Sequence, residues 1–186
     1  MVDDLKQAIE VVRGGGVILY PTDTVWGIGC DATNAGAVRR IYDIKQRADS
    51  KSMLVLIDST AKLDYYVDEL PGIALDLIDV SDKPLTIIYS GARNVAPSLI
   101  AADGTLGIRV TQEAFSHALC QRLRKPIVST SANISGRPAP ANFAEISDDI
   151  KKSVDFIVNY RQTDKQKAHP SGIIQLGAGG LFKIIR

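Results

Sequence analysis

One stretch, residues 17–57, constrains the fold and the chemistry of this chain more than any other. It begins with the apolar run Val17–Tyr20, which passes directly into the polar turn Pro21–Thr24. A glycine-spaced segment and a helical pattern follow, and that pattern ends in Lys45–Arg47 before a second apolar run at Met53–Ile57. A buried strand that leads into hydroxyls, followed by a helix that ends in cations, predicts an anion-binding site built on a sheet.

The helical part of this stretch places Lys45 at the end of a buried face. Asn34 is a good N-cap, and positions i, i+3, i+4 and i+7 of the helix share one face. These positions are Val38, Ile41, Tyr42 and Lys45. Because the first three are apolar, we expect Lys45 to emerge into a cavity, with Arg47 on the same side if the chain turns extended after Lys45. The alternative is an exposed helix end whose cations complement the macrodipole.

Composition describes an ordinary globular protein. Of the 186 residues, 45% are hydrophobic and 23% are charged, which predicts one domain, residues 1–186, with a sizeable core. The formal net charge of +1 gives no reason to expect a dedicated nucleic-acid-binding protein, so any basic patch must be local.

The cysteines, the histidines and the apolar runs exclude several further classes of protein. Cys30 and Cys120 lie far apart and the chain has two histidines, which predicts reduced thiols and no protein-built metal site. We find no signal peptide and no apolar run of membrane-spanning length, and we therefore expect a cytoplasmic protein.

Strand patterns alternate with helical patterns along the chain. Helices are expected at 3–13, 34–45, around 63–67, 71–80, 113–123 and 142–152. Strands are expected at 17–20, 53–57, 85–89, 105–110, from 127, and at 155–159, 171–176 and 181–185, the last two forming a hairpin with a turn at 177–180. This alternation predicts an α/β fold with a mixed sheet and helices packed on it.

The strand expected at 105–110 aims polar groups off the sheet. Its alternation places Thr105, Gly107 and Arg109 on one face and three aliphatic residues on the other. An arginine and a hydroxyl therefore point the same way. The alternative is an arginine on a solvent-facing side of the sheet.

The strand that begins at Ile127 becomes polar at its end. A period of two places Ser129, Ser131 and Asn133 on one side, and ligands commonly bind at strand ends in α/β sheets. The alternative is a hydrogen-bonded turn, which serine and asparagine also favour. A serine nucleophile is not indicated, because the G-x-S-x-G context is missing. The Gly14–Gly16 triplet lacks phosphate-loop spacing and reads as a helix end.

Four segments then form a combined signature. They are Tyr20–Gly29, Lys45–Arg47, Gly107–Val110 and Ser129–Gly136. In this order and context they resemble the YrdC/TsaC family, the threonylcarbamoyl-AMP synthases. The joint match of a Lys-x-Arg and a Ser-x-Asn signature is specific, and the resemblance covers nearly the whole chain.

The resemblance implies a fold and a reaction. The fold is a twisted mixed sheet with flanking helices around a concave basic cavity. The reaction joins L-threonine, bicarbonate and ATP into L-threonylcarbamoyladenylate and pyrophosphate, with Mg²⁺ bound through the triphosphate. A threonylcarbamoyl transferase complex then moves the group to adenosine 37 of tRNA.

The resemblance also implies roles for individual residues. The positions tied to catalysis are Lys45, Arg47, Ser131 and Asn133. ATP contacts are expected from Arg47, Lys51, Thr105, Ser131, Asn133 and Arg186. Contacts to L-threonine are expected from Thr24, Arg109, Ser129 and Ser171, and no residue is expected to bind a metal.

Four positions depart from the family pattern. Lys51 stands where many members have asparagine, and Leu56 stands where one branch has a threonine-binding histidine. Ala139 replaces a serine, and Gly172 replaces a threonine. These departures keep open a non-catalytic paralogue that binds tRNA or double-stranded RNA weakly. A carbamoyltransferase-type relative is a third possibility.

Overall fold

The computed structural model describes residues 1–48, 53–164, 170–177 and 181–186. Its described strands form one nine-stranded sheet in the order β7-β1-β2-β6-β3-β5-β4-β8-β9. Their bounds are β1 Ile18–Tyr20, β2 Gly27–Gly29, β3 Leu54–Ile57, β4 Leu85–Tyr89, β5 Leu106–Val110, β6 Ile127–Ser131, β7 Phe156–Ile157, β8 Gly172–Leu176 and β9 Phe182–Ile184. The sheet is mixed, because β1–β7, β3–β5 and β4–β8 are parallel and the other neighbours are antiparallel. The expected α/β class is confirmed.

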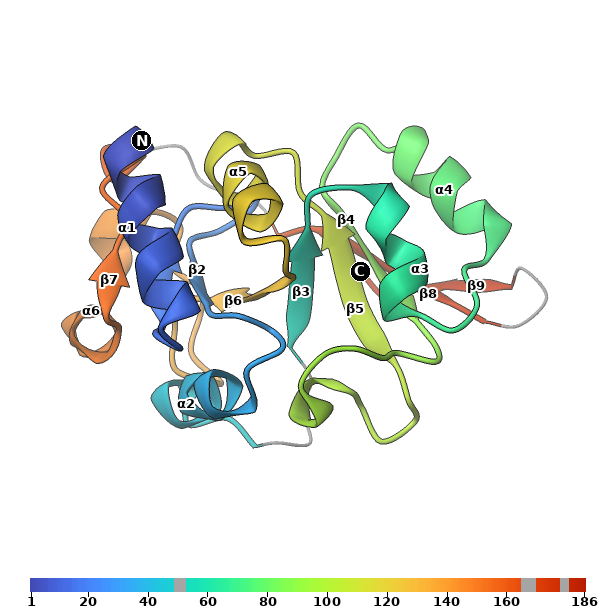
Figure 1. Ribbon diagram of the computed structural model, residues 1–186, viewed down its shortest axis with the longest axis horizontal. Coiled ribbons are helices and arrows are strands. Elements are labelled where there is room, and N and C mark those ends of the chain that lie inside the picture. The colour runs from blue at the N-terminus through green and yellow to red at the C-terminus, as the bar shows by residue number, and fades with distance from the viewer. Residues whose placement is uncertain (49–52, 165–169, 178–180) are drawn as a thin grey trace.

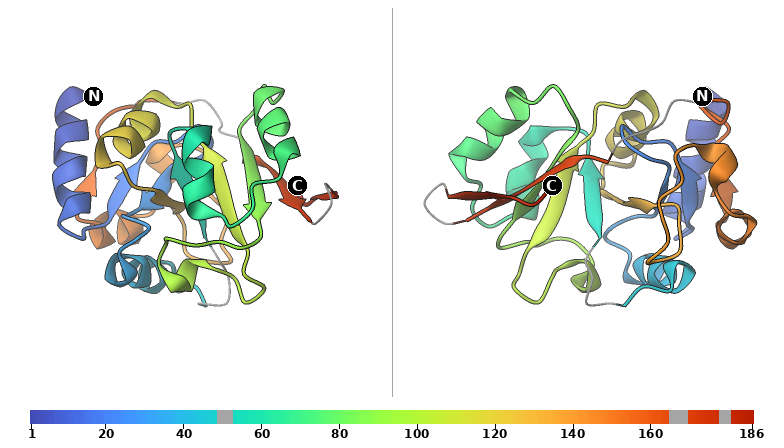
Figure 2. Two further views of the ribbon diagram at one scale, coloured as in Figure 1. Left: turned by 45° about the vertical axis from the view of Figure 1, so that its right-hand side comes forward. Right: turned by 180° about the vertical axis from the view of Figure 1, so that it is seen from behind.

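The helices flank this sheet, as Figure 1 shows, with β7 at one side of the molecule and β8 and β9 at the other. The right-hand view of Figure 2 shows the β8–β9 hairpin and the strands it adjoins from behind. The helices are α1 Val2–Arg13, α2 Ala35–Lys45, α3 Leu63–Tyr66, α4 Gly72–Asp79, α5 Ala114–Leu123 and α6 Asp148–Ser153. Three 3₁₀ turns lie at Thr60–Lys62, Pro97–Leu99 and Phe143–Glu145.

Most expected elements are present, with one clear correction. The helix expected over 142–152 is divided into a 3₁₀ turn and α6, with Ile146 in an extended conformation between them. The Ile146 side chain is buried in the core. Asn142 caps the 3₁₀ turn by accepting a hydrogen bond from the Ala144 amide, and Ser147 is the N-cap of α6, so the segment contains two helix starts. The second start interrupts the local helical pattern at Ile146.

Alternation along the strands builds two apolar cores on opposite faces. Val55 and Val128 face one core, which α2, α3 and α4 cover. Leu56 and Ile127 face the other, which α1 and α5 cover. Because side chains alternate, Ser129 and Arg109 share the face of Ile127 and Leu56. Polar site residues thus lie on the same face as the second core.

Gly29 allows the strands at this point to approach closely. A Cβ atom there would lie 2.5 Å from the Val128 carbonyl oxygen and 2.6 Å from the Tyr20 ring. Only glycine fits, because carbon atoms do not approach backbone oxygen that closely. Gly29 therefore lets β2 pack between β1 and β6. Gly27, two residues earlier, faces a cavity.

Candidate functional site

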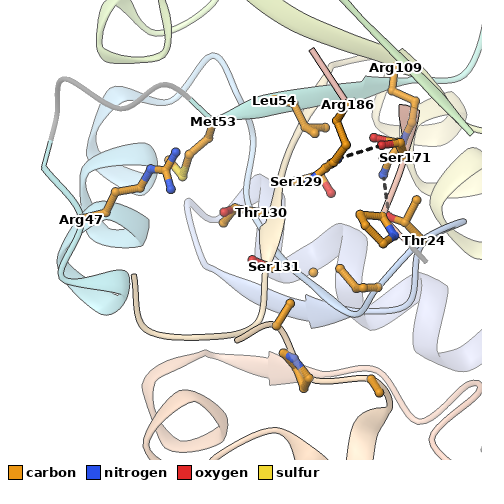
Figure 3. A pocket seen from close by; sticks show the side chains of 16 residues that line it. Thr24, Arg47, Met53, Leu54, Arg109, Ser129, Thr130, Ser131, Ser171 and Arg186 are labelled. Atoms are coloured by element: carbon orange, nitrogen blue, oxygen red, sulfur yellow. Dashed lines mark hydrogen bonds between the residues drawn. The ribbon is translucent and has the colours of Figure 1, made fainter. Parts of the chain in front are cut away.

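A cavity of about 460 Å³ lies where the β1–β2 turn, the end of α2, the start of β3, β5 and β6 meet. Figure 3 shows its labelled side chains converging from these segments and from the C-terminal residues. The described lining residues are Thr24, Val25, Gly27, Arg47, Met53, Leu54, Arg109, Ser129, Thr130, Ser131, Ala139, Pro140, Ala141, Pro170, Ser171 and Arg186. Three are arginines and none has a carboxylate side chain, so this described wall suits an anionic ligand.

Seven of the residues singled out in the sequence lie on this wall, although they span 163 positions of the chain (24 to 186). They are Thr24, Arg47, Arg109, Ser129, Ser131, Ser171 and Arg186. Lys45 and Asn133 lie behind the wall, and Thr105 lines an adjoining cavity. Lys51 falls outside the residues that the structure describes.

Arg109 is buried and paired with Asp23. Its Nη2 atom lies 3.0 Å from Asp23 Oδ1, although the two groups are not aligned for a hydrogen bond. The same atom donates to Thr24 Oγ1 at 3.3 Å. The Arg109 side chain is 3% exposed, which excludes the alternative of a solvent-facing arginine. Its Nε–H is buried and has no hydrogen-bond partner among the described residues.

Burial disfavours both charges of this pair. It lowers the pKa of Arg109, and the neighbouring Asp23 carboxylate opposes that change. It raises the pKa of Asp23, while Arg109 acts in the opposite direction. A second anion beside the arginine would stabilise the guanidinium further and would satisfy its unpaired Nε–H.

Lys45 is buried behind the cavity wall and does not project into the cavity. Its side chain donates to the Ser131 carbonyl at 2.6 Å and to the Asn133 carbonyl at 2.8 Å. The residue is 2% exposed, which excludes the exposed helix end considered from the sequence. Burial, with a smaller effect from Arg47, lowers the pKa of Lys45 to about 8. The ammonium therefore holds the end of β6 in place while adding positive charge beneath it.

The end of α2 turns Arg47 toward the cavity by a route that differs from the expected extension. Gln46 adopts the left-handed conformation with φ of 49°. The Gln46 amide donates to Asp43 and the Arg47 amide donates to Tyr42, the pattern of a Schellman motif. The chain thus reverses at Gln46, and Arg47 joins the cavity wall.

Ser131 and Asn133 form a hydrogen-bonded corner at the end of β6. Ser131 Oγ donates to Asn133 Oδ1 at 2.5 Å. The Asn133 amide donates to the Arg137 carbonyl and so closes the following loop. Ser131 faces the cavity, whereas Asn133 holds the loop and the position of Ser131. The hydrogen-bonded turn considered as an alternative is thus present together with the exposed serine.

The C-terminal residues complete the wall. Arg186 Nε donates to the Ser171 carbonyl at 3.1 Å, and Figure 3 shows both beside Arg109. Ser171 precedes β8 and is buried, with its hydroxyl 2.9 Å from that of Thr86. Residues more than sixty positions apart thus meet because β4, β5 and β8 are neighbours in the sheet.

A second cavity of about 220 Å³ adjoins the first and shares Met53 and Leu54 with it. Its other described lining residues are Thr86, Ile88, Thr105, Leu106, Gly107 and Ile173. Thr105 Oγ1 donates to Asp103 at 2.7 Å. The slot is mostly apolar with two hydroxyls, a lining that suits a flat heterocycle better than a charged group.

The described departures from the family pattern fall in different surroundings. Leu56 is fully buried in the second core and is not on the wall of the first cavity. Ala139 lines that cavity. A Cβ atom at Gly172 would meet Leu85 at 3.6 Å, an ordinary contact, so the backbone there does not demand glycine.

Three residues of this site escaped the sequence reasoning. The sequence pattern indicates a turn residue at Asp23 and places Thr130 on the other face of its strand. Arg161 donates to the Thr22 carbonyl at 3.1 Å and pairs with Glu113 at 3.5 Å, which ties the β1–β2 turn to α5. For Asp23, the sequence signal is its position between two threonines directly after a strand. No local pattern points to Arg161.

No cluster of three or more His, Cys, Asp or Glu side chains is arranged to hold a metal ion in the part of the chain that the structure describes. No described helix has the length and apolar character needed to cross a bilayer.

Comparison with known proteins gives a consistent result. The family model Sua5_yciO_yrdC, described as "Telomere recombination", matches residues 10–186. A threonylcarbamoyl-AMP synthase of Pseudoalteromonas translucida is 35% identical over 158 residues, covering 83% of this chain and 84% of the relative. A threonylcarbamoyl-AMP synthase of Stutzerimonas stutzeri is 31% identical over 180 residues, covering 96% of each.

A solved structure shares the fold. The crystal structure of P. abyssi Sua5 complexed with L-threonine superposes with a TM-score of 0.82 at 26% identity. The match covers 92% of this chain and 50% of the Sua5 chain. This chain therefore corresponds to about half of that protein.

Proposed function

This chain belongs to the Sua5/YciO/YrdC family, and we propose that it is a threonylcarbamoyl-AMP synthase. It would join L-threonine, bicarbonate and ATP into L-threonylcarbamoyladenylate and pyrophosphate. One observation carries the proposal: three arginines and several hydroxyls from distant segments line a single cavity whose described wall has no carboxylate. All substrates of this reaction present anionic groups, which that wall suits.

We assign the amino-acid end of L-threonine to the region around Arg109. Its unpaired Nε–H and its Nη2 atom offer donors to a carboxylate, which arginine binds with two parallel hydrogen bonds. Thr24, Ser129 and Ser171 lie on the same wall and supply hydroxyls for the substrate amine and hydroxyl. The likeness to a Sua5 structure solved with L-threonine supports this assignment.

We assign the triphosphate to the part of the cavity lined by Arg47 and Ser131. Arg186, which is bonded to Ser171 beside Arg109, would reach it from the amino-acid side. The adjoining apolar slot with Thr105 would then take the adenine ring. Lys51, which precedes β3, stays a predicted ATP contact. Mg²⁺ would be bound by the triphosphate itself, because no carboxylate appears among the described wall residues.

The chemistry then requires positioning and charge stabilisation. The amine of L-threonine combines with bicarbonate to give a carbamate and water, forming a C–N bond. A carbamate oxygen attacks the α-phosphorus, and the bond to pyrophosphate breaks. The chain supplies no nucleophile in this scheme. Arg109 orients one reactant and Arg47 the other, while Lys45 and Asn133 keep Ser131 in register.

We further propose the biological setting. Residues 1–186 would act as one domain, since one sheet runs through the described chain. The product would pass to a threonylcarbamoyl transferase complex that modifies adenosine 37 of tRNA. That role fits the cytoplasmic location expected from the sequence.

The test is pyrophosphate release by the purified chain with ATP and Mg²⁺. We expect release that needs L-threonine and bicarbonate together and stops when either is omitted. Arg47→Ala should lower the rate strongly. Arg39→Ala removes an exposed arginine of α2, the helix that precedes Arg47, and should not. Absence of release with all substrates present would overturn the proposal, and salt-sensitive RNA binding in its place would favour the non-catalytic paralogue.

A further inference from the structure

Two buried hydroxyls meet between the two cavities. Thr86 Oγ1 and Ser171 Oγ are 2.9 Å apart, and the two residues are 2% and 3% exposed. Ser171 lines the first cavity, beside Arg186 in Figure 3, whereas Thr86 lines the second. Because Thr86 is not on the wall of the first cavity, any influence it has there passes through Ser171.

The sheet fixes the backbone on both sides of this contact. β4 and β8 are parallel neighbours, with Thr86 opposite Ile173. The Gly172 amide donates to the Pro84 carbonyl at 3.0 Å, and the Ser171 carbonyl accepts from Arg186. With its main chain held at two points, Ser171 keeps mainly the freedom to rotate its side chain and hydroxyl. The hydrogen bond to Thr86 limits that rotation.

The direction of this hydrogen bond decides what Ser171 offers a ligand. A hydroxyl has one proton to donate and two lone pairs to accept with. When Thr86 donates, the Ser171 proton is left for an anionic group in the cavity. When Thr86 accepts, Ser171 presents lone pairs to an N–H or O–H group. The Thr86 hydroxyl makes no other hydrogen bond within the described part of the chain, so it is committed to Ser171.

We propose that Thr86 is a positioning residue for the amino-acid substrate and acts by orienting the hydroxyl of Ser171. This inference rests on the proposed function, since it takes L-threonine as the ligand of the first cavity. The competing role for Thr86 is a direct contact with the nucleotide, since the residue borders the slot assigned to adenine. The two roles affect different substrates, so the Michaelis constants separate them.

The experiment measures pyrophosphate release by the full chain and by Thr86→Val, with L-threonine and ATP varied separately. Valine keeps the branched shape and removes the hydroxyl. We expect KM for L-threonine to rise about five- to tenfold, which corresponds to one hydrogen bond, with KM for ATP and kcat within twofold. Thr86→Ser restores the hydroxyl and should restore the wild-type KM for L-threonine. If the valine variant fails to fold, Thr86→Ala provides the same comparison.

A double-mutant cycle tests whether the effect passes through Ser171. In a Ser171→Ala background, Thr86→Val should leave KM for L-threonine unchanged, because no hydroxyl remains to orient. An unaltered KM for L-threonine in Thr86→Val, a rise in KM for ATP instead, or an undiminished effect in the Ser171→Ala background would each overturn the inference alone. Wild-type protein that releases no pyrophosphate would overturn the proposed function and this inference with it.

Discussion

Replacing Lys45 by methionine should separate the contribution of this residue to stability from its contribution to activity. Lys45 is 2% exposed, and its ammonium donates to two carbonyl oxygens at the end of β6. Methionine has a similar length and no charge, so the core around the site keeps its volume. The substitution removes a buried charge and, at the same time, removes the donor for the carbonyls of Ser131 and Asn133.

These two effects on stability oppose each other. Burial lowers the pKa of Lys45 from 10.5 to about 8, and this difference corresponds to about 3 kcal/mol against the charged form in the fold. Two carbonyls left without their donor cost about 1–3 kcal/mol each. The change in the free energy of unfolding at pH 7 should therefore lie between a rise of about 1 kcal/mol and a fall of about 3 kcal/mol.

Activity should respond much more strongly than stability. The ammonium supports the corner that presents Ser131 and contributes positive charge near the proposed phosphate site. We expect pyrophosphate release to fall by about 100-fold or more, as for loss of one preorganised electrostatic group. Denaturant unfolding measures the first quantity and steady-state pyrophosphate release measures the second. Lys152→Met, a change of an exposed lysine in α6, should alter neither.

The pH dependence gives the same prediction a second readout. Since the pKa of Lys45 is lower in the fold than in the unfolded chain, the unfolded state binds more protons between about pH 8 and 10.5. Wild-type stability should gain from this residue as pH rises through that window, and Lys45→Met should lack the gain. Activity that needs the charged ammonium should decline above about pH 8. If the variant loses activity only in proportion to the fraction unfolded, Lys45 is structural and the reasoning fails.

Three further outcomes follow from contacts outside this corner. Arg109→Lys should raise KM for L-threonine about tenfold or more with a smaller change for ATP, because lysine cannot make two parallel hydrogen bonds to a carboxylate; equal changes for both substrates would argue against the assignment. Asp155 accepts from Arg40 and from a backbone amide, so Asp155→Asn should lower stability by about 1 kcal/mol at neutral pH, after screening at its partly exposed position. The pKa of Asp155 is lowered chiefly by the Arg40 hydrogen bond, so in urea unfolding the difference should vanish as pH falls below its ordinary 3.8; persistence at pH 2 would refute the cause. Burial raises the pKa of Cys30 and Cys120, so neither thiol should react with a disulfide reagent until the protein unfolds, and fast labelling of the native chain would contradict their placement.

Local sequence patterns predicted the elements of this fold because the forces that define them are local. Asn34 accepts a hydrogen bond from the Ala37 amide at 3.0 Å, and the helix after it ends at Lys45 as expected. Strand alternation correctly placed Arg109 opposite the aliphatic residues of β5. The split of 142–152 escaped prediction, because Ser147 provides a second N-cap inside the helical pattern that starts at Asn142.

The pairing of side chains across the sheet was beyond any local pattern. Asp23 and Arg109 are 86 positions apart, and their contact depends on where β1, β2 and β5 come to lie in the sheet. The family resemblance located Arg109 but gave no partner for it. A buried arginine nevertheless requires compensation for its charge, so an acid within reach was to be expected on physical grounds.

The geometry of β6 explains why the cavity forms where it does. The first half of β6 pairs with β3, placing Ser129 opposite Leu54, and its second half pairs with β2, placing Ser131 opposite Gly27. These two partners lie on opposite edges of β6. On the β2 edge the pairing runs along the whole strand, because the amides of Ala132 and Val128 donate to the carbonyls of Trp26 and Cys30. On the other edge β3 begins only opposite Ser129, so no described strand lies beside Thr130 and Ser131 there, and both line the cavity. The start of β3 partway along β6 thus leaves hydroxyls on the wall of a hollow, whereas a β3 that continued further would have paired this edge.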